Sequence, residues 1–123
     1  MTDFSGLNLA QPILRAISDK SYTLPTPIQL KSIPPLLEGH DLLGIAQTGT
    51  GKTAAFALPL LHRLAQNPGT VKRGKPRALI LVPTRELASQ VSDNLRSYGR
   101  HLPVCTAVIF GGTNIRPQIR AMS

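Results

Sequence analysis

The sequence predicts an α/β fold in which a parallel sheet is flanked by helices. Three apolar runs have the length and composition of strands, at residues 42–46, 78–82 and 104–110. Segments with apolar residues at every third or fourth position separate these runs, as expected of helices. Strands that alternate with helices are typical of right-handed βαβ units and of a parallel sheet. The length of 123 residues suits one domain, 1–123.

Two helices are expected before the first strand. Residues 9–20 place four apolar side chains on one helical face, Leu9, Ile13, Leu14 and Ile17. The second helix begins where Thr26 precedes Pro27, because a hydroxyl can cap the first turn and a proline at the first position forgoes no hydrogen bond. We expect Pro34 and Pro35 to break or kink this helix.

The remaining elements follow the first strand. Residues 54–65 and 84–98 are the other expected helices, and residues 67–77 form a loop rich in turn formers. Three apolar residues recur at intervals of four in the second of these helices, Leu87, Val91 and Leu95. A glycine pair, Gly111-Gly112, closes the third strand.

A glycine-rich loop after the first strand has the chemistry of a phosphate-binding site. It reads Ala46-Gln47-Thr48-Gly49-Thr50-Gly51-Lys52-Thr53. Its glycines let successive backbone N–H groups turn toward phosphate oxygens, and the following helix directs the positive end of its dipole at the same anion. Lys52 supplies positive charge for the β- and γ-phosphates, and the Thr53 hydroxyl is placed to ligate Mg²⁺. The general pattern begins with glycine, where this chain has Ala46.

Composition excludes several classes of protein. A hydrophobic content of 41% argues against wholesale disorder, and no apolar run approaches the roughly 20 residues that span a bilayer. The first residues lack the basic start and apolar centre of a signal peptide. The single cysteine, Cys105, has apolar neighbours and is expected to be a buried structural thiol. We therefore expect a cytoplasmic protein with no membrane partner.

The net charge of +8 permits a polyanionic partner and supplies long-range attraction to one. Charge alone does not distinguish RNA from DNA or from a membrane surface. The densest basic cluster, residues 72–77, lies in a loop broken by glycine and proline. We interpret it as a solvated linker rather than a dedicated binding patch.

Three further segments carry candidate binding residues. The Gln29 amide can match the N6 and N7 groups of adenine, and Tyr22 can stack on a base, although each is also compatible with an ordinary structural role. Thr84 and Arg85 follow the second strand at the sheet edge where ligands gather, and can hold a phosphodiester. A capped helix with a solvated Arg85 is the simpler interpretation of that segment alone. Gly111-Gly112 permits a close backbone approach, or is a plain loop.

In this order and spacing, the segments resemble the amino-terminal part of a DEAD-box ATP-dependent RNA helicase, most similar to the bacterial RhlE-type branch. The resemblance runs from Phe4, which corresponds to an upstream aromatic of the family, to about Gly112. The family's phosphate loop has alanine where the general pattern has glycine, which accounts for Ala46. Four segments match its motifs: residues 21–29 the Q motif, 46–53 the phosphate loop, 83–88 motif Ia and 111–112 the glycine doublet.

The resemblance implies part of a RecA-like P-loop NTPase domain that binds ATP with Mg²⁺. Lys52 and Thr53 are its implied catalytic residues, and Thr53 reaches the metal through ATP. The phosphate loop is implied to hold the nucleotide together with Tyr22, Thr26 and Gln29. Five residues are implied to contact the RNA backbone without sequence preference, Pro83, Thr84, Arg85, Gly111 and Gly112. The other implied partner is a second RecA-like domain.

Two departures from the family pattern bear on mechanism. Ser21 stands where the family usually has glycine, before Tyr22. The sequence contains neither the Asp-Glu-Ala-Asp box nor the Ser-Ala-Thr motif, and the second domain is absent. Only two carboxylates follow the phosphate loop, Glu86 and Asp93, and neither follows an apolar strand as the Mg²⁺-holding and water-orienting carboxylates do. We therefore expect that the chain alone does not turn over ATP appreciably.

Two functional interpretations stay open. The first is the ATP-binding portion of a helicase that couples ATP hydrolysis to RNA unwinding or remodelling. The second is a non-catalytic module that binds adenine nucleotide or RNA without turnover. An unrelated P-loop kinase or GTPase explains neither Tyr22 with Gln29 nor residues 83–88. A sheet that ends after the third strand is also expected to expose an unpaired edge and apolar surface.

Overall fold

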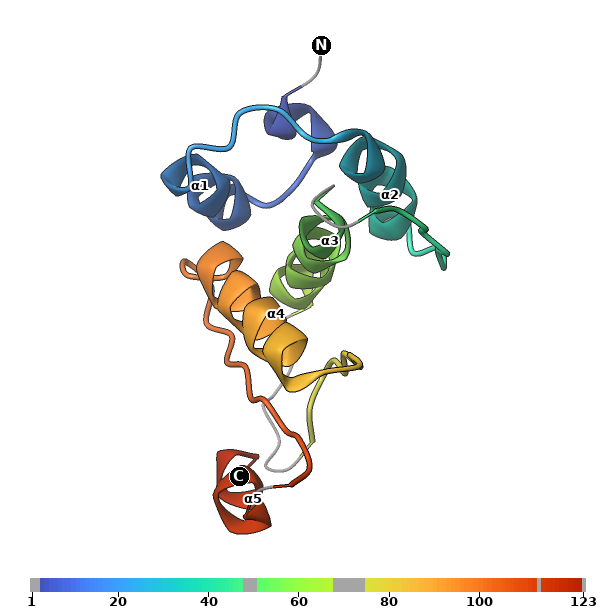
Figure 1. Ribbon diagram of the computed structural model, residues 1–123. Helices are drawn as coiled ribbons and strands as arrows, with labels where there is room; N and C mark the ends of the chain where they lie inside the picture. Colours follow the sequence, from blue (N-terminus) through green and yellow to red (C-terminus); the bar gives the residue numbers. More distant parts are fainter. Residues whose placement is uncertain (1–2, 48–50, 68–74, 113, 123) are drawn as a thin grey trace.

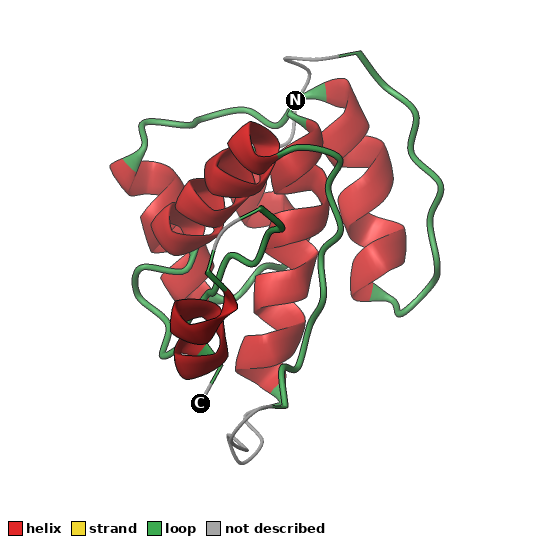
Figure 2. Ribbon diagram, turned by 60° about the horizontal axis from the view of Figure 1, so that its bottom comes forward, coloured by secondary structure: helices red, strands yellow, loops and turns green. Residues whose placement is uncertain are grey.

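The computed structural model describes residues 3–47, 51–67, 75–112 and 114–122. Regular structure in these ranges is helical (Figures 1 and 2). The elements in chain order are η1 (Phe4–Leu7), α1 (Gln11–Asp19), α2 (Pro27–Leu37), α3 (Lys52–Gln66), α4 (Arg85–Tyr98) and α5 (Ile115–Ala121). None of the described helices is long and apolar enough to cross a membrane.

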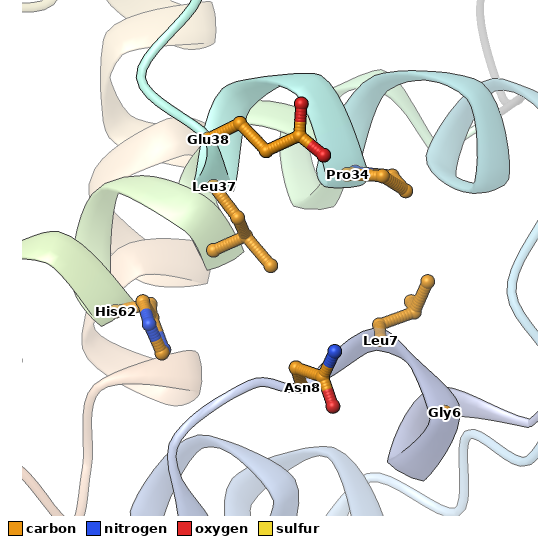
Figure 3. Close-up of a pocket in the computed structure, with 7 residues that line it drawn as sticks. All are labelled: Gly6, Leu7, Asn8, Pro34, Leu37, Glu38 and His62. Atoms are coloured by element: carbon orange, nitrogen blue, oxygen red, sulfur yellow. The ribbon is translucent and has the colours of Figure 1, made fainter.

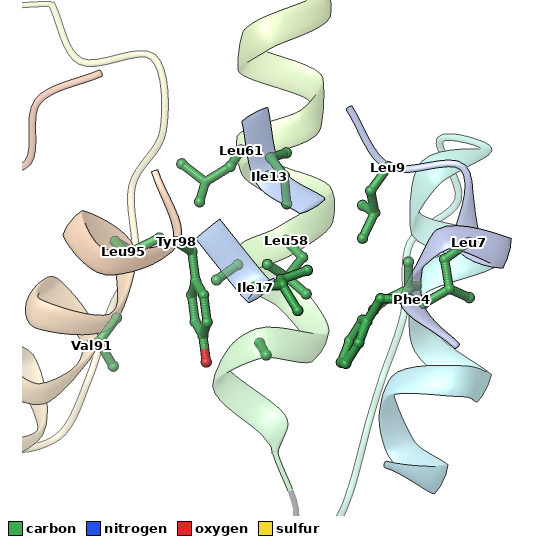
Figure 4. Close-up of a cluster of buried hydrophobic side chains, with 13 residues drawn as sticks. Phe4, Leu7, Leu9, Ile13, Ile17, Leu58, Leu61, Val91, Leu95 and Tyr98 are labelled. Carbon is green, nitrogen blue, oxygen red and sulfur yellow. The ribbon is translucent and has the colours of Figure 1, made fainter. Parts of the chain in front are cut away.

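The hydrophobic core forms around α3. Leu58 of α3, Ile13 of α1 and Ile33 of α2 are fully buried, and the inner face of α4 adds Val91 and Leu95. Figure 4 shows these helices contributing side chains to one cluster, which Phe4 of η1 also joins. Burying each large aliphatic side chain stabilises the fold by roughly 1.5–3 kcal/mol. The beginning of α3, where the phosphate loop ends, is therefore anchored to the most buried part of the molecule.

The predicted helices are present, with ends shifted by one or two residues. Thr84 caps α4 as expected, because its Oγ1 accepts a hydrogen bond from the Leu87 N–H at 3.1 Å. The helix α2 begins at Pro27, also as predicted.

The expected break at Pro34 and Pro35 is wrong, because α2 continues through both prolines to Leu37. The carbonyl groups deprived of an N–H partner belong to Leu30 and Lys31, which are exposed. Water can therefore satisfy those carbonyls, and the buried Ile33 holds this part of α2 against the core.

The three predicted strands are the main correction. In the ranges that the structure describes, residues 42–46, 78–82 and 104–110 are not assigned as strands. A strand needs the backbone of a neighbour, and parallel strands that follow one another in the chain need not be neighbours in a sheet. The sequence pattern predicts extended segments correctly only in their alternating burial. Ile80 and Val82 pack against the core, whereas Leu81 between them is 85% exposed.

The last extended segment alternates in the same way. Val104 and Thr106 are half-buried, and Cys105 between them is exposed. The prediction of a buried Cys105 is therefore wrong, since apolar neighbours in sequence do not cover a side chain that faces away from the helices. A helix that the sequence did not predict, α5, follows this segment and has no buried residue.

Candidate functional site

The end of the phosphate loop is held in a conformation that favours glycine. Gly51 has a φ of +87° and directly precedes Lys52, the first residue of α3. A Cβ at Gly51 would overlap the Gln29 side-chain nitrogen and lie 3.0 Å from Thr26 Oγ1. Lys52 is exposed and Thr53 half-buried, so both are available at the helix start. The predicted residues Thr48, Gly49 and Thr50 lie outside the described ranges, and Ala46 and Gln47 precede that gap.

Gln29 connects the start of α2 to the phosphate loop. Its Oε1 accepts a hydrogen bond from the Thr26 N–H at 2.9 Å, and its Nε2 donates to the Gly51 carbonyl at 3.2 Å. Gln29 is only 5% exposed. Its side-chain amide keeps one more donor and one more acceptor position beyond these two bonds. The structure therefore brings Thr26, Gln29 and Gly51 together, as the sequence led us to expect.

Thr26 supplies an unsatisfied polar atom at the same place. Its Oγ1 is buried and has no hydrogen-bond partner among the described residues. A buried hydroxyl without a partner costs roughly 1–3 kcal/mol, so such atoms usually await a ligand or water. Together with the open backbone at Gly51, this hydroxyl fits a polar ligand at the start of α3.

Tyr22 lies at a different contact from Gln29. Its ring is 45% exposed and stands 6.4 Å from the ring of Tyr98, with Lys20 Nζ at 5.6 and 5.3 Å from the two ring centres. Burial, and then the neighbouring Tyr22, raise the pKa of the Tyr98 hydroxyl above its ordinary value. Lys20 also donates to Ser97 Oγ at 3.1 Å. Tyr22 therefore ties the segment after α1 to the end of α4 and keeps one ring face available.

Two cavities of the described structure lie apart from the phosphate loop. One of about 320 Å³ lies between η1, α2 and α3, where Glu38 and His62 face it (Figure 3). His62 Nδ1 accepts a hydrogen bond from the Ala10 N–H at 3.0 Å, and burial lowers the pKa of this imidazole. The other, of about 260 Å³, includes Phe4 and Tyr22 in its lining. Neither cavity includes Gln29 or Gly51.

The second predicted site forms where α4 meets residues 110–112. Arg85 Nη2 donates a hydrogen bond to the Gly111 carbonyl at 2.7 Å, and the guanidinium lies 5.0 Å from the centre of the Phe110 ring. Gly112 has a φ of +79°, and a Cβ there would collide with the Arg85 side chain. The simpler interpretation of Arg85 as a solvated side chain is therefore wrong. Motif Ia and the glycine doublet form one local structure.

The other predicted residues of this site are open to solvent. Pro83, Thr84, Gly111 and Gly112 are exposed, and α4 begins at Arg85 with its positive dipole end directed outward. The guanidinium has five N–H donors, of which the Gly111 bond uses one. The arrangement can accept an anionic backbone in addition to its internal contacts.

The carboxylates do not form a metal-binding or catalytic group. Glu86 lies in the first turn of α4 and Asp93 on its exposed face, as their sequence context suggested. No cluster of three His, Cys, Asp or Glu residues that can hold a metal is found in the described ranges. The strongest acid contact is elsewhere, where a hydrogen bond from His101 at 2.7 Å, assisted by Arg100, lowers the pKa of Asp19.

Three residues at these sites were not singled out by the sequence reasoning. Tyr98 and Phe110 are the aromatic partners of Tyr22 and Arg85, and Gln118 of α5 bonds to the backbone of Phe110. Phe110 directly precedes the glycine doublet, so its position was a usable signal. Tyr98 and Gln118 come close only through folding.

Comparison with known proteins gives the family. The model of the DEAD/DEAH box helicase family matches residues 26–123. The chain is 53% identical over 112 residues to the ATP-dependent RNA helicase SrmB of Escherichia coli, covering 91% of the chain and 25% of that relative. It is 45% identical over 122 residues to the ATP-dependent RNA helicase DeaD of Klebsiella pneumoniae, covering 98% of the chain and 18% of the relative. The chain thus spans about a quarter or less of these relatives.

Solved structures agree with the sequence comparison and confirm the fold class. A DEAD box protein from Methanococcus jannaschii superposes with a TM-score of 0.85 at 42% identity, over 99% of this chain and 32% of that one. The RNA helicase Prp28 of Chaetomium thermophilum, solved with ADP, gives a TM-score of 0.83 at 38% identity, over 96% of this chain and 29% of its own. The extended segments therefore follow the course they take in part of a RecA-like domain. The chain belongs to the DEAD/DEAH box helicase family.

Proposed function

We propose that this chain is the ATP-binding portion of an ATP-dependent RNA helicase, which couples ATP hydrolysis to unwinding or remodelling of RNA. The observation that carries the proposal is the hydrogen bond from Gln29 Nε2 to the Gly51 carbonyl at 3.2 Å. It ties the predicted adenine-reading residue to the last glycine of the phosphate loop. Both relatives described above are named as ATP-dependent RNA helicases, which supports the same activity.

The nucleotide site fits ATP with Mg²⁺. The unpartnered Thr26 hydroxyl and the glycine-only backbone at Gly51 leave room for a polar ligand, and Lys52 and Thr53 stand at the start of α3. Lys52 would neutralise phosphate charge, and Thr53 would orient the metal. When bound, Mg²⁺ supplies further charge neutralisation at the β- and γ-phosphates. Gln29 and Tyr22 would read and stack on adenine.

RNA would be held by Pro83, Thr84, Arg85, Gly111 and Gly112. The bond between Arg85 and Gly111 supports this assignment, because it joins the two predicted RNA segments into one surface. Contacts from a guanidinium and a helix start address the phosphate backbone and carry no sequence information. A second RecA-like domain would supply the opposite face and the arginines that stabilise the transferring phosphoryl group. The RhlE-type branch and a cytoplasmic location stay predictions within this proposal.

The alternative is that the chain by itself binds adenine nucleotide or RNA without turnover. The positions of Glu86 and Asp93 favour it for this polypeptide, because both carboxylates lie on α4 rather than beside the phosphate loop. Phosphoryl transfer without a metal-holding and a water-orienting carboxylate lacks its main positioning groups.

Calorimetric titration of the chain with ATP and with ADP tests the nucleotide site. We expect saturable binding that Lys52→Ala and Gln29→Ala each weaken about tenfold or more, as loss of a charge-assisted or buried hydrogen bond does. Gln66→Ala, which removes an exposed glutamine at the end of α3, is the matched control and should bind normally.

Phosphate release in the presence of single-stranded RNA separates the two interpretations. Binding without release is expected of this chain, and release that appears on adding the rest of a helicase would assign the activity to the assembled protein. A wild-type chain that folds but binds neither ATP nor ADP would overturn the proposed nucleotide site.

A further inference from the structure

One side chain of α5 pairs with both backbone groups of Phe110. Gln118 Oε1 accepts a hydrogen bond from the Phe110 N–H at 2.8 Å, and Gln118 Nε2 donates to the Phe110 carbonyl at 3.1 Å. This two-bond pattern is the one that a neighbouring strand provides to an extended residue. The Gln118 amide therefore takes the place of a strand partner at this position, and it fixes the backbone immediately before Gly111.

The fixed residue is the one against which Arg85 packs. The Phe110 ring lies 5.0 Å from the Arg85 guanidinium, and the carbonyl of the next residue accepts the Arg85 hydrogen bond at 2.7 Å. Both contacts of the guanidinium thus depend on the backbone direction at Phe110. A rotation of that backbone would move the ring and the Gly111 carbonyl together.

The same two bonds attach α5 to the rest of the molecule. The helix has seven residues, and none of them is buried. A helix of this length is not stable alone in water, and apolar packing contributes little here. The bonds of Gln118 therefore carry much of the attachment, and they connect it directly to the glycine doublet.

We propose that Gln118 is a positioning residue for RNA binding: it holds residues 110–112 in the conformation that orients Arg85 toward an RNA backbone. The inference rests on the proposed function for its premise that Arg85 and the glycine doublet contact RNA. Gln118 itself acts through Phe110 and is not placed on the RNA. Its loss should therefore resemble the loss of Arg85 rather than add to it.

The first test is a double-mutant cycle with a fluorescently labelled single-stranded uridine oligonucleotide. We expect Arg85→Ala and Gln118→Ala each to weaken binding about tenfold, the effect of one charge-assisted contact. The double variant should bind about as well as either single variant, because both remove the same contact. Each should also lower the slope of affinity against salt by about one phosphate contact. Gln11→Ala, an exposed glutamine on α1 at the opposite end of Figure 1, is the control and should bind normally.

The second test reads the loop without RNA. Hydrogen exchange followed by NMR should show a protected Phe110 amide in the wild-type chain, and Gln118→Ala should remove that protection. Gln118→Glu should retain it, because a carboxylate still accepts from the Phe110 N–H. Wild-type protection in Gln118→Ala, or additive losses in the double variant, would overturn the inference. Normal affinity of Arg85→Ala would instead overturn the proposed RNA contact, and the inference with it.

Discussion

At the scale of single residues, backbone geometry explains choices that residue chemistry alone leaves unexplained. Gly51 is needed because φ is +87° and because Gln29 and Thr26 occupy the space where a side chain would lie. Ser21 is the opposite case, a non-glycine residue at a φ of +60°. Its N–H bonds to the Ser18 carbonyl at 2.9 Å, which closes the last turn of α1. The departure from the family's usual glycine is therefore a locally strained helix end.

Replacing Ser21 by glycine should stabilise the chain by about 1 kcal/mol, because a non-glycine residue in the left-handed region is strained there. The measurement is urea unfolding followed by circular dichroism. Ser18→Gly, within the same helix, is the matched control and should destabilise by about 0.5–1 kcal/mol. A destabilised Ser21→Gly chain would contradict this account of the helix end.

At the scale of elements, α4 carries the clearest link between a local sequence signal and a site. Thr84 caps the helix through its Oγ1, and the adjacent Arg85 is thereby held at the exposed helix start. The opposite end of α4 presents Tyr98 to Tyr22. One helix therefore touches both the segment proposed to bind adenine and the one proposed to bind RNA.

Thr84→Ala should destabilise the chain by about 1 kcal/mol, because the Leu87 N–H loses its acceptor. Thr84→Ser retains the hydroxyl and should recover most of that loss. Unfolding midpoints in urea provide the comparison, with Ser89→Ala as an exposed control within α4. Equal midpoints for Thr84→Ala and Thr84→Ser would show that the cap does not contribute.

At the scale of the whole molecule, the helices are packed and the extended segments are half-covered. Leu43, Ile45, Leu79 and Leu81 are each at least 78% exposed. Continuous exposed apolar surface beside unpaired backbone favours association between chains. The sequence analysis expected this exposure, although it placed the same residues in paired strands.

The chain should therefore self-associate at concentrations of tens of micromolar, an order of magnitude that weak apolar interfaces reach. A Leu79→Lys, Leu81→Lys double variant should shift sedimentation toward the monomer, because it places charge on the exposed side of residues 78–82. Leu24→Lys, at an exposed loop position, is the control and should leave association unchanged. Equal association of all three chains would show that this segment is not involved.

The sequence by itself determined the helices, their caps and the candidate sites, because these depend on short-range chemistry. Thr26-Pro27, Thr84 and the glycine-rich loop each predict their local structure from residues a few positions apart. Only the tertiary structure decided which distant residues meet, as in Gln29 with Gly51, Arg85 with Gly111, and Gln118 with Phe110. It also decided the fate of the predicted strands. A strand exists through a neighbour's backbone, and no apolar run encodes where that neighbour lies.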